Sequence, residues 1–151
     1  MSDNIPTSTI DEINSLNSYW VIKAWKNKEG IQRQIDYIVK DKSIGIHFGN
    51  HGPFPTNVTD IQIVEKQPET KKPSRKMIQE FCNDIKIGDK IIIGKGKTGS
   101  LFVAEIASTY YYQPSDNIDD CQHRRRIKNI RRVPEEFIRQ SQIKTLKHFT
   151  N

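Results

Sequence analysis

Two apolar runs on either side of a glycine-rich turn constrain the fold more than any other feature of the chain. Ile91–Ile93 precedes the turn at 94–99, and a β-branched and aromatic run follows at 101–107. Such a pattern is typical of a β-hairpin. The turn contains Gly-Lys-Thr at 96–98, but a phosphate-binding P-loop would need glycine where Ile91 stands and would lead into a helix. We therefore predict a hairpin and no nucleotide hydrolysis.

Short strand and helix signals alternate over the rest of the chain. Aromatic and β-branched runs predict further strands at 19–25, 43–48 and 123–130. Capping or helical spacing predicts helices that begin at 9–12, around 31–38, and at Ser74 to run to 85. This mixture predicts an α+β fold, a small mixed and partly closed β-barrel with flanking helices.

The predicted domain organisation is a single domain with short ends. We expect a flexible N-terminal tail at 1–8, a single domain at 9–142, and a tail or linker at 143–151. Within the domain, polar or glycine-bearing residues predict loops at 27–30 and 65–74.

Composition limits the partners and the compartment. The chain has 151 residues, enough for one domain that folds without disulfides, and its formal net charge of +6 favours an anionic partner. The two cysteines, Cys82 and Cys121, are far apart and suggest neither zinc nor a disulfide. The sequence shows no signal-peptide pattern and no membrane-spanning run, so we expect a cytoplasmic protein with no membrane partner.

Catalytic and metal-binding patterns are missing from the sequence. His47 and His51 flank a loop without a carboxylate helper, and Glu105 is expected to point outward from its strand. The acidic run at 116–120 lacks the glycine and glutamate of a calcium-binding loop. We expect no cofactor, no metal site and no catalytic residue.

Several segments resemble the EVE/YTH branch of the PUA-like superfamily over residues 19 to 133. YWVIKA, IGIHFG, FCNDIKIGDK and LFVAEI resemble its first two strands, its helix with a "GD" turn, and its "VGEI" strand. YYYQP at 110–114 and HRRRI at 123–127 resemble the "YxYdP…pHRRxV" signature. That signature belongs to the N-terminal modified-base-reading domains of modification-dependent restriction proteins.

The resemblance implies a small barrel around a pocket that accepts an extruded base. A base must leave the duplex to be inspected on all edges, and aromatic rings can then stack on it. Phe48 and Asn129 stand where relatives often carry tryptophan, which leaves the type of base open. The candidate pocket residues are Trp25, Phe48, Trp20, Tyr110 and Tyr112, with His47 or Asn50 as edge contacts.

Each candidate also has a structural explanation. Trp20 is expected in the core, Trp25 in either place, and strand alternation allows at most two of the tyrosines at 110–112 to share one pocket. Arg124 and Arg126 should share a strand face opposite Arg125. The expected nucleic-acid backbone contacts are Lys95, Lys97, His123, Arg124, Arg125, Arg126 and Lys128. A solvated charged face, or pairing with the acidic loop, is the alternative.

The sequence thus predicts a nucleic-acid-binding module that flips a modified base, methylated or hydroxymethylated and in DNA, into an aromatic pocket. A separate nuclease or ATPase component would supply any cleavage. Three alternatives remain open at this point: a PUA-like protein that binds RNA, a sensor of small molecules or nucleotides that uses the same pocket, and an unrecognised hydrolase whose activity would depend on Glu105 or His123.

Overall fold

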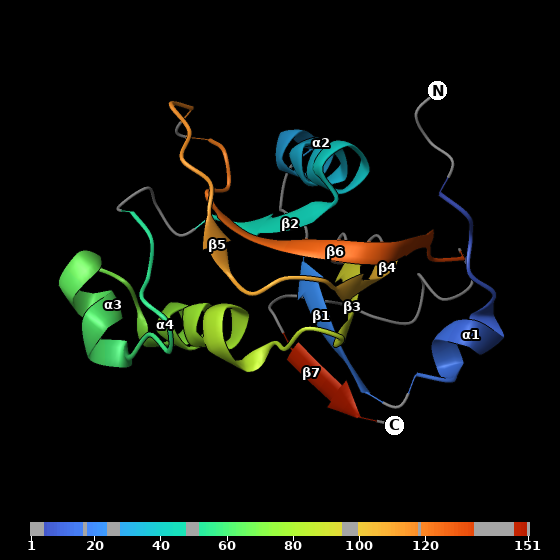
Figure 1. Ribbon diagram of the computed structural model, residues 1–151, viewed down its shortest axis with the longest axis horizontal. Helices are drawn as coiled ribbons and strands as arrows, with labels where there is room; N and C mark the ends of the chain where they lie inside the picture. Colours follow the sequence, from blue (N-terminus) through green and yellow to red (C-terminus); the bar gives the residue numbers. More distant parts are fainter. Residues whose placement is uncertain are drawn as a thin grey trace.

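The computed structural model describes residues 5–16, 18–23, 28–47, 52–94, 100–117, 119–134 and 147–150. It contains a mixed set of helices and strands, so the predicted α+β class is confirmed (Figure 1). The helical elements are α1 (Ile10–Asn14), α2 (Lys28–Asp36), η1 (Tyr37–Asp41), α3 (Asp60–Lys66), α4 (Lys72–Gln79) and η2 (Glu80–Asp84). The strands are β1 (Ser18–Lys23), β2 (Ser43–Ile46), β3 (Lys90–Gly94), β4 (Ser100–Ile106), β5 (Tyr111–Tyr112), β6 (His123–Arg132) and β7 (Lys147–Thr150).

The strands form one sheet in the order β2-β6-β4-β3-β1-β7, and β5 pairs with β6 outside this path. β1 and β3 are parallel, and the other pairs are antiparallel. β3 and β4 pair from Lys90↔Glu105 to Gly94↔Ser100, as the hairpin prediction requires. The tip of that hairpin, 95–99, lies outside the described residues. Within the described part of the chain the edge strands β2 and β7 are not paired with each other, so the predicted partial barrel is not shown.

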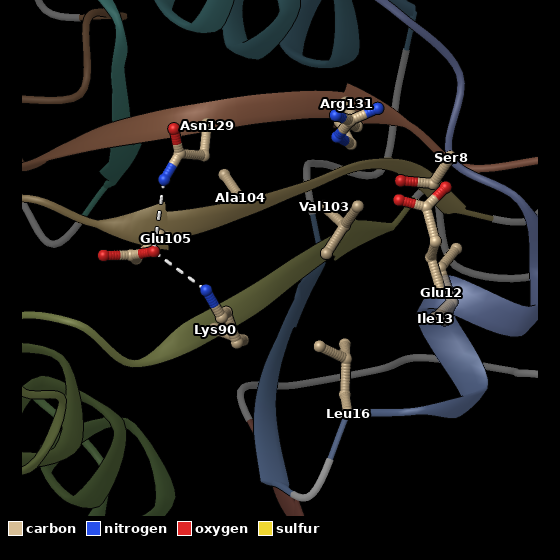
Figure 2. A pocket seen from close by; sticks show the side chains of 10 residues that line it. All are labelled: Ser8, Glu12, Ile13, Leu16, Lys90, Val103, Ala104, Glu105, Asn129 and Arg131. Carbon is tan, nitrogen blue, oxygen red and sulfur yellow. Dashed lines mark hydrogen bonds and ion pairs between the residues drawn. The ribbon is translucent and has the colours of Figure 1, made fainter.

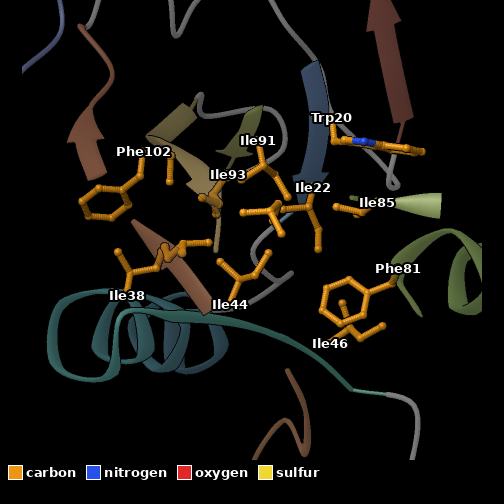
Figure 3. Close-up of a cluster of buried hydrophobic side chains, with 13 residues drawn as sticks. Trp20, Ile22, Ile38, Ile44, Ile46, Phe81, Ile85, Ile91, Ile93 and Phe102 are labelled. Carbon is orange, nitrogen blue, oxygen red and sulfur yellow. The ribbon is translucent and has the colours of Figure 1, made fainter. Parts of the chain in front are cut away.

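Alternation along β3 divides the core between the two faces of the sheet. Ile91 and Ile93 face the larger cluster, which includes Trp20 and Phe102 (Figure 3), whereas Ile92 faces a smaller cluster beside α1. Burying one such side chain contributes roughly 1.5–3 kcal/mol to folding. The run of three isoleucines therefore stabilises both layers at once.

Trp20 belongs to the larger cluster, as the alternation in its strand predicts. Its side chain is buried among apolar neighbours, and its indole Nε1 donates a hydrogen bond to Asp89 Oδ2 at 2.9 Å. A buried indole needs such a partner for its N–H. Trp20 is therefore a core residue rather than a wall of a ligand pocket.

Two predicted loops are wrong in their bounds. α2 begins at Lys28 and includes a buried Gly30, so the helix starts inside the segment expected to be a loop. α3 ends at Lys66, inside the other predicted loop, and it is a further helix beyond those predicted, opened by a capping box between Thr59 and Gln62. α4 starts at Lys72 rather than at a Ser74 cap, because Pro73 fits the first turn of a helix.

Backbone pairing holds parts of both predicted tails. Thr7 forms a parallel bridge with Arg132, and the Ser8 N–H donates to the Arg132 carbonyl at 2.9 Å. At the other end, β7 pairs with β1 from Ser18↔Thr150 to Val21↔Lys147. Residues 7–8 and 147–150 therefore lie on the sheet and do not form the free tails expected there. No helix among the described residues is long and apolar enough to cross a bilayer.

Candidate functional site

The strand pair β5–β6 separates two cavities. Tyr111 pairs with Arg124 and Tyr112 with His123 in the backbone ladder. The first cavity, here called the tyrosine pocket, has a volume of about 510 Å³ and is lined by residues 53–57, 82–83, 85–87 and 109–112 with Arg125. The second, the basic cleft, has about 520 Å³ and is lined by Tyr37, Lys40, Asp41, Tyr111, residues 113–115, Asp120, Arg124 and Arg126. Tyr111 lines both cavities.

Aromatic rings stack at the wall of the tyrosine pocket. The fully buried His123 ring lies parallel to Phe54, with centroids 4.8 Å apart, and to Tyr110 at 5.8 Å. Tyr112 meets the same imidazole edge-on at 5.3 Å and donates its hydroxyl to Gln122. His123 is therefore the centre of an aromatic stack, and it is not placed to contact phosphate, which corrects the sequence prediction.

The Tyr110 hydroxyl links His123 to the loop that carries Phe54. Its oxygen accepts the Phe54 N–H at 3.1 Å and lies 2.7 Å from His123 Nδ1. The hydroxyl oxygen therefore joins the backbone of the Phe54 loop to the imidazole. Burial raises the pKa of Tyr110, so the phenol stays protonated near neutral pH.

Arg125 lies in the wall of the tyrosine pocket and is only 1% exposed. Its guanidinium donates to three backbone carbonyls: Nε to Ser108 at 2.9 Å, Nη1 to Phe81 at 2.7 Å and Nη2 to Ile85 at 2.8 Å. Two of these carbonyls belong to the end of the α4–η2 helix, where a cation is favourable. Arg125 therefore fastens this helix to β6 and is not available to an external phosphate, contrary to the sequence prediction.

The basic cleft contains one buried and one exposed arginine. Arg124 stacks on Tyr37 with its guanidinium carbon 3.6 Å from the ring centroid, and it donates to the Cys121 carbonyl at 2.6 Å. Its exposure is 6%, so its principal role is internal, which again corrects the prediction of a phosphate contact. Arg126 is exposed and lies 5.2 Å over the Tyr111 ring. Arg124 and Arg126 thus share one face of β6, as alternation predicts.

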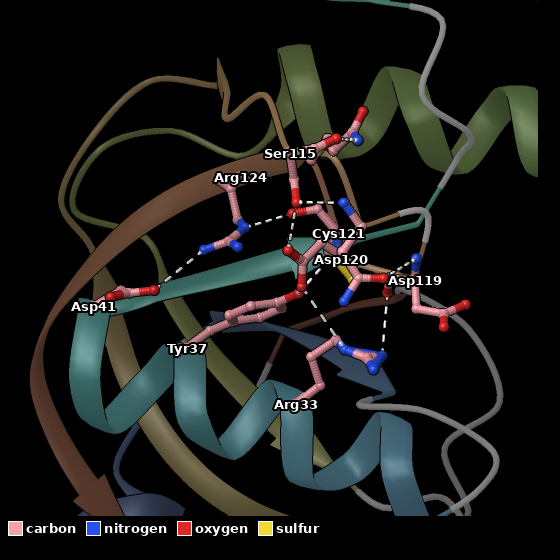
Figure 4. A network of polar contacts seen from close by, with 10 residues as sticks. Arg33, Tyr37, Asp41, Ser115, Asp119, Asp120, Cys121 and Arg124 are labelled. Carbon is pink, nitrogen blue, oxygen red and sulfur yellow. Dashed lines mark hydrogen bonds and ion pairs between the residues drawn. The ribbon is translucent and has the colours of Figure 1, made fainter.

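A polar network holds the acidic loop against α2 and η1 (Figure 4). The Tyr37 hydroxyl donates to Asp120 Oδ1 at 3.1 Å and accepts the Cys121 N–H at 2.9 Å. Asp120 also accepts from Ser115 at 2.6 Å and lies 3.8 Å from Arg33. The Ser115 hydrogen bond, with the Tyr37 hydroxyl and the nearby arginines, lowers the pKa of Asp120. The acidic loop therefore pairs in part with cations of its own chain.

A smaller cavity of about 190 Å³ lies between α1 and the outer face of the sheet (Figure 2). Glu105 lines it and pairs with Lys90 at 2.8 Å and with Lys128 at 3.5 Å. The hydrogen bond from Lys90, followed by that from Asn129, lowers the pKa of Glu105. Glu105 points outward as expected. It forms an ion pair with Lys128, whose side chain is more than half exposed, and this pairing partly neutralises the lysine. Across the residues with assigned positions there is no group of His, Cys, Asp or Glu that could hold a metal ion.

Comparison with known protein families places most of the chain in one of them. The family model described as "Domain of unknown function (DUF8426)" matches residues 20–151. The chain belongs to the DUF8426 family. Comparisons with curated proteins and with solved structures gave no match. The matched DUF8426 region contains both cavities and all of β6.

The structure brings together some of the predicted site residues in this DUF8426 chain and leaves others apart. Tyr110 and Tyr112 share the tyrosine pocket, and Arg126 lies at the basic cleft. His47 is exposed directly after β2 and is not among the residues that line either cavity. The predicted residues Trp25, Phe48, Asn50, Lys95 and Lys97 lie outside the described residues.

Sequence reasoning missed several residues that shape the two cavities. Tyr37 and Lys40 line the basic cleft from η1, although helical spacing in the sequence indicates only the apolar face of that helix. Phe54 is buried between two exposed prolines and reaches the aromatic stack from a distant loop. The sequence signal for this contact is an isolated phenylalanine between two prolines, because a large apolar side chain is more often buried than exposed in a loop.

Proposed function

We propose that this chain is a nucleic-acid-binding module that places one unstacked base in the tyrosine pocket while cations of the basic cleft contact the neighbouring phosphates. The preferred ligand is DNA that carries a modified base. One observation carries this proposal: Tyr111 lines both cavities, so an aromatic pocket and a cationic cleft adjoin along a single short strand. A nucleotide offers the matching pair of a flat base and a charged phosphate.

The energetics of base extrusion are compatible with these two cavities. Taking a base out of a duplex costs a few kcal/mol, and stacking it on aromatic rings contributes roughly 1–3 kcal/mol. The tyrosine pocket falls within the roughly 300–1,000 Å³ usual for small-ligand sites, with a volume of about 510 Å³. Stacking can therefore offset most of the extrusion cost, and phosphate contacts supply the remaining affinity.

The cations available for phosphate are fewer than the sequence suggests. Lys40 and Arg126 are exposed at the basic cleft, and Lys128 follows on the same face of β6. His123, Arg124 and Arg125 are buried. We therefore assign the phosphate contacts to Lys40 and Arg126, with Lys128 as a weaker contributor because Glu105 already pairs with it.

The position of the family-like signature supports the same assignment. The segments YYYQP and HRRRI, which resemble the PUA-like signature, form β5 and the start of β6, where the two cavities meet. We propose on this ground that the chain is related to the EVE/YTH branch and that its sheet belongs to a partly closed barrel. The module has no catalytic step of its own in this proposal, and a separate nuclease or ATPase polypeptide would act on the bound DNA.

Competition binding tests the proposal. Labelled duplexes that differ only in one central base would be titrated by fluorescence anisotropy: cytosine, 5-methylcytosine or 5-hydroxymethylcytosine, and adenine or N6-methyladenine. A structured RNA would be titrated in parallel. We expect one modified duplex to bind most tightly, with affinity that falls steeply between about 50 mM and about 200 mM salt. Preference for the RNA would point instead to an RNA-binding protein, and affinity indifferent to salt would point to a small-molecule sensor.

Two variants with matched controls locate the contacts. Arg126→Ala is expected to weaken all duplexes several-fold and to reduce the salt slope by about one. Lys28→Ala removes the same charge at the first residue of α2, which is not in the lining of either cavity, and should bind as the wild type does. Tyr111→Ala should reduce the preference for the modified base, and Tyr111→Phe, which keeps the ring, should not. Equal losses in Arg126→Ala and Lys28→Ala would contradict the assignment of the cleft.

A further inference from the structure

The tyrosine pocket has positive charges in its lining. Arg125 lines the pocket and Lys86 stands at its rim, whereas no Asp or Glu is among the described lining residues. The basic cleft differs in this respect, because Asp41 and Asp120 line it. Water screens the charge of Arg125 poorly, because the residue is only 1% exposed. Its electrostatic effect on a ligand in the pocket is therefore stronger than that of an exposed arginine.

Neighbouring groups offset this charge only in part, because the Asp89 carboxylate acts on Arg125 electrostatically without lining the pocket. The three carbonyls that accept hydrogen bonds from the Arg125 guanidinium are dipoles and carry no net charge. The Cys82 thiol lines the same pocket, but burial raises its pKa to about 12, so it stays protonated near neutral pH. Burial lowers the pKa of Arg125, yet a guanidinium remains protonated in proteins.

We infer that the tyrosine pocket admits uncharged bases and rejects bases that carry a fixed positive charge. This inference rests on the proposed function in taking the ligand to be a nucleobase. It names the class of base that the pocket admits, and it excludes bases made cationic by methylation of a ring nitrogen. Neutral modifications, such as a methyl or hydroxymethyl group on carbon 5 of cytosine, remain admissible.

The inference makes a prediction opposite to that of the aromatic rings alone. A cage of tyrosine and phenylalanine rings attracts cations through the ring quadrupole. Arg125 in the same pocket repels them, and like charges a few ångströms apart in a poorly screened site outweigh one cation–π contact. Whether the pocket prefers neutral or cationic bases therefore shows whether Arg125 or the aromatic rings dominate its electrostatics.

Binding of free nucleosides, which carry no phosphate, tests whether the pocket prefers neutral or cationic bases. The wild-type protein, labelled with ¹⁵N, would be titrated with two matched pairs, guanosine against 7-methylguanosine and cytidine against 3-methylcytidine. A mildly acidic pH keeps the methylated nucleosides cationic and the parents neutral. We expect each neutral nucleoside to bind at least about tenfold more tightly than its cationic partner. Equal or tighter binding of the cations would overturn the inference, and so would the absence of saturable binding by all four.

Variants at the two positive side chains separate their roles. In Arg125→Gln, checked for folding by circular dichroism, the preference should vanish or invert. In Lys86→Gln, which changes an exposed side chain, a several-fold preference should persist; its complete loss would assign the selection to Lys86 and overturn the role of Arg125. If Arg125→Gln does not fold, the wild-type and Lys86→Gln titrations still decide the matter.

The outcome is distinguishable from that of the proposed function. If the protein discriminates among nucleosides but binds no duplex and no RNA, the proposed nucleic-acid function is contradicted. The inferred selection of neutral bases is then still supported. Tight binding of a duplex with a central cationic base, equal to that of its neutral partner, would remove the selection rule and leave the function intact.

Discussion

Three consecutive arginines of β6 occupy three different environments. Arg124 stacks on Tyr37, Arg125 fastens the α4–η2 helix, and Arg126 lies exposed over Tyr111. Strand alternation predicts which face of β6 each arginine lies on, but it does not predict how deeply each side chain is buried. Burial depends on which backbone carbonyls and aromatic rings pack against the strand. These groups come from distant parts of the chain, so a local sequence pattern does not indicate them.

Arg125→Met should destabilise the fold far more than Arg126→Met. The first substitution leaves two buried carbonyls and one partly buried carbonyl without donors. Each buried carbonyl left without a donor costs about 1–3 kcal/mol, and removing a buried charge offsets part of that loss. We expect a net loss of at least about 2 kcal/mol in the free energy of unfolding in urea. Arg126→Met, on the exposed face, should change it by less than about 1 kcal/mol. Similar losses in the two variants would contradict the structural role of Arg125.

At the scale of elements, α2 and η1 protect the edge of the sheet at β2. The Gln34 side chain donates to the Gly45 carbonyl at 2.7 Å and accepts the Gly45 N–H at 3.0 Å, so a side-chain amide takes the place of a further strand. Exposed edge strands invite pairing with other chains, and this contact covers the edge. The sequence predicts both the helix and the strand, but it does not indicate that a buried glutamine joins them.

Gly45→Ala tests how closely the elements approach there. An added Cβ would lie 2.6 Å from Cys121 Cβ and 3.1 Å from Arg124 Cδ. We expect a loss of about 1–3 kcal/mol in the free energy of unfolding, measured in urea, because overpacking forces backbone shifts. In a double-mutant cycle, Cys121→Gly should recover part of the loss caused by Gly45→Ala. Strict additivity of the two substitutions would contradict steric overlap with Cys121 as its cause.

The acidic loop provides a pH-dependent prediction. The pKa of Asp120 is lowered in the folded state, chiefly by the Ser115 hydrogen bond. Its contribution to stability is therefore fully present above the unfolded-state pKa of about 4 and is lost as pH falls through the lower folded-state value. Asp120→Asn should reduce stability at neutral pH and show a shallower loss of stability below about pH 4 than the wild type. Parallel acid limbs, measured by thermal unfolding across pH, would contradict the assignment.

At the scale of the whole molecule, the sequence predicts more of the fold than of the site. The apolar runs on either side of the turn at 94–99 predict the hairpin, because a hairpin depends on local pattern, whereas the division of the core between the two faces of the sheet comes from the structure. The bulge at Asn129, with φ of 52°, is not visible in that pattern. It moves the core-facing positions of β6 from Arg125 and Ile127 to Ile130 and Arg132. The cavities depend on such shifts and on Phe54 and Tyr37, which approach from loops and helices remote in sequence.

The central claim is that β5 separates a base-binding pocket from a phosphate-binding cleft. The most direct test is chemical-shift mapping of the ¹⁵N-labelled protein during titration with a short duplex that carries the preferred modified base. The account predicts that the largest shifts fall on Tyr110–Tyr112 and on Lys40 and Arg126, on both sides of β5. Shifts concentrated at the cavity beside α1, or the absence of shifts at β5, would contradict it.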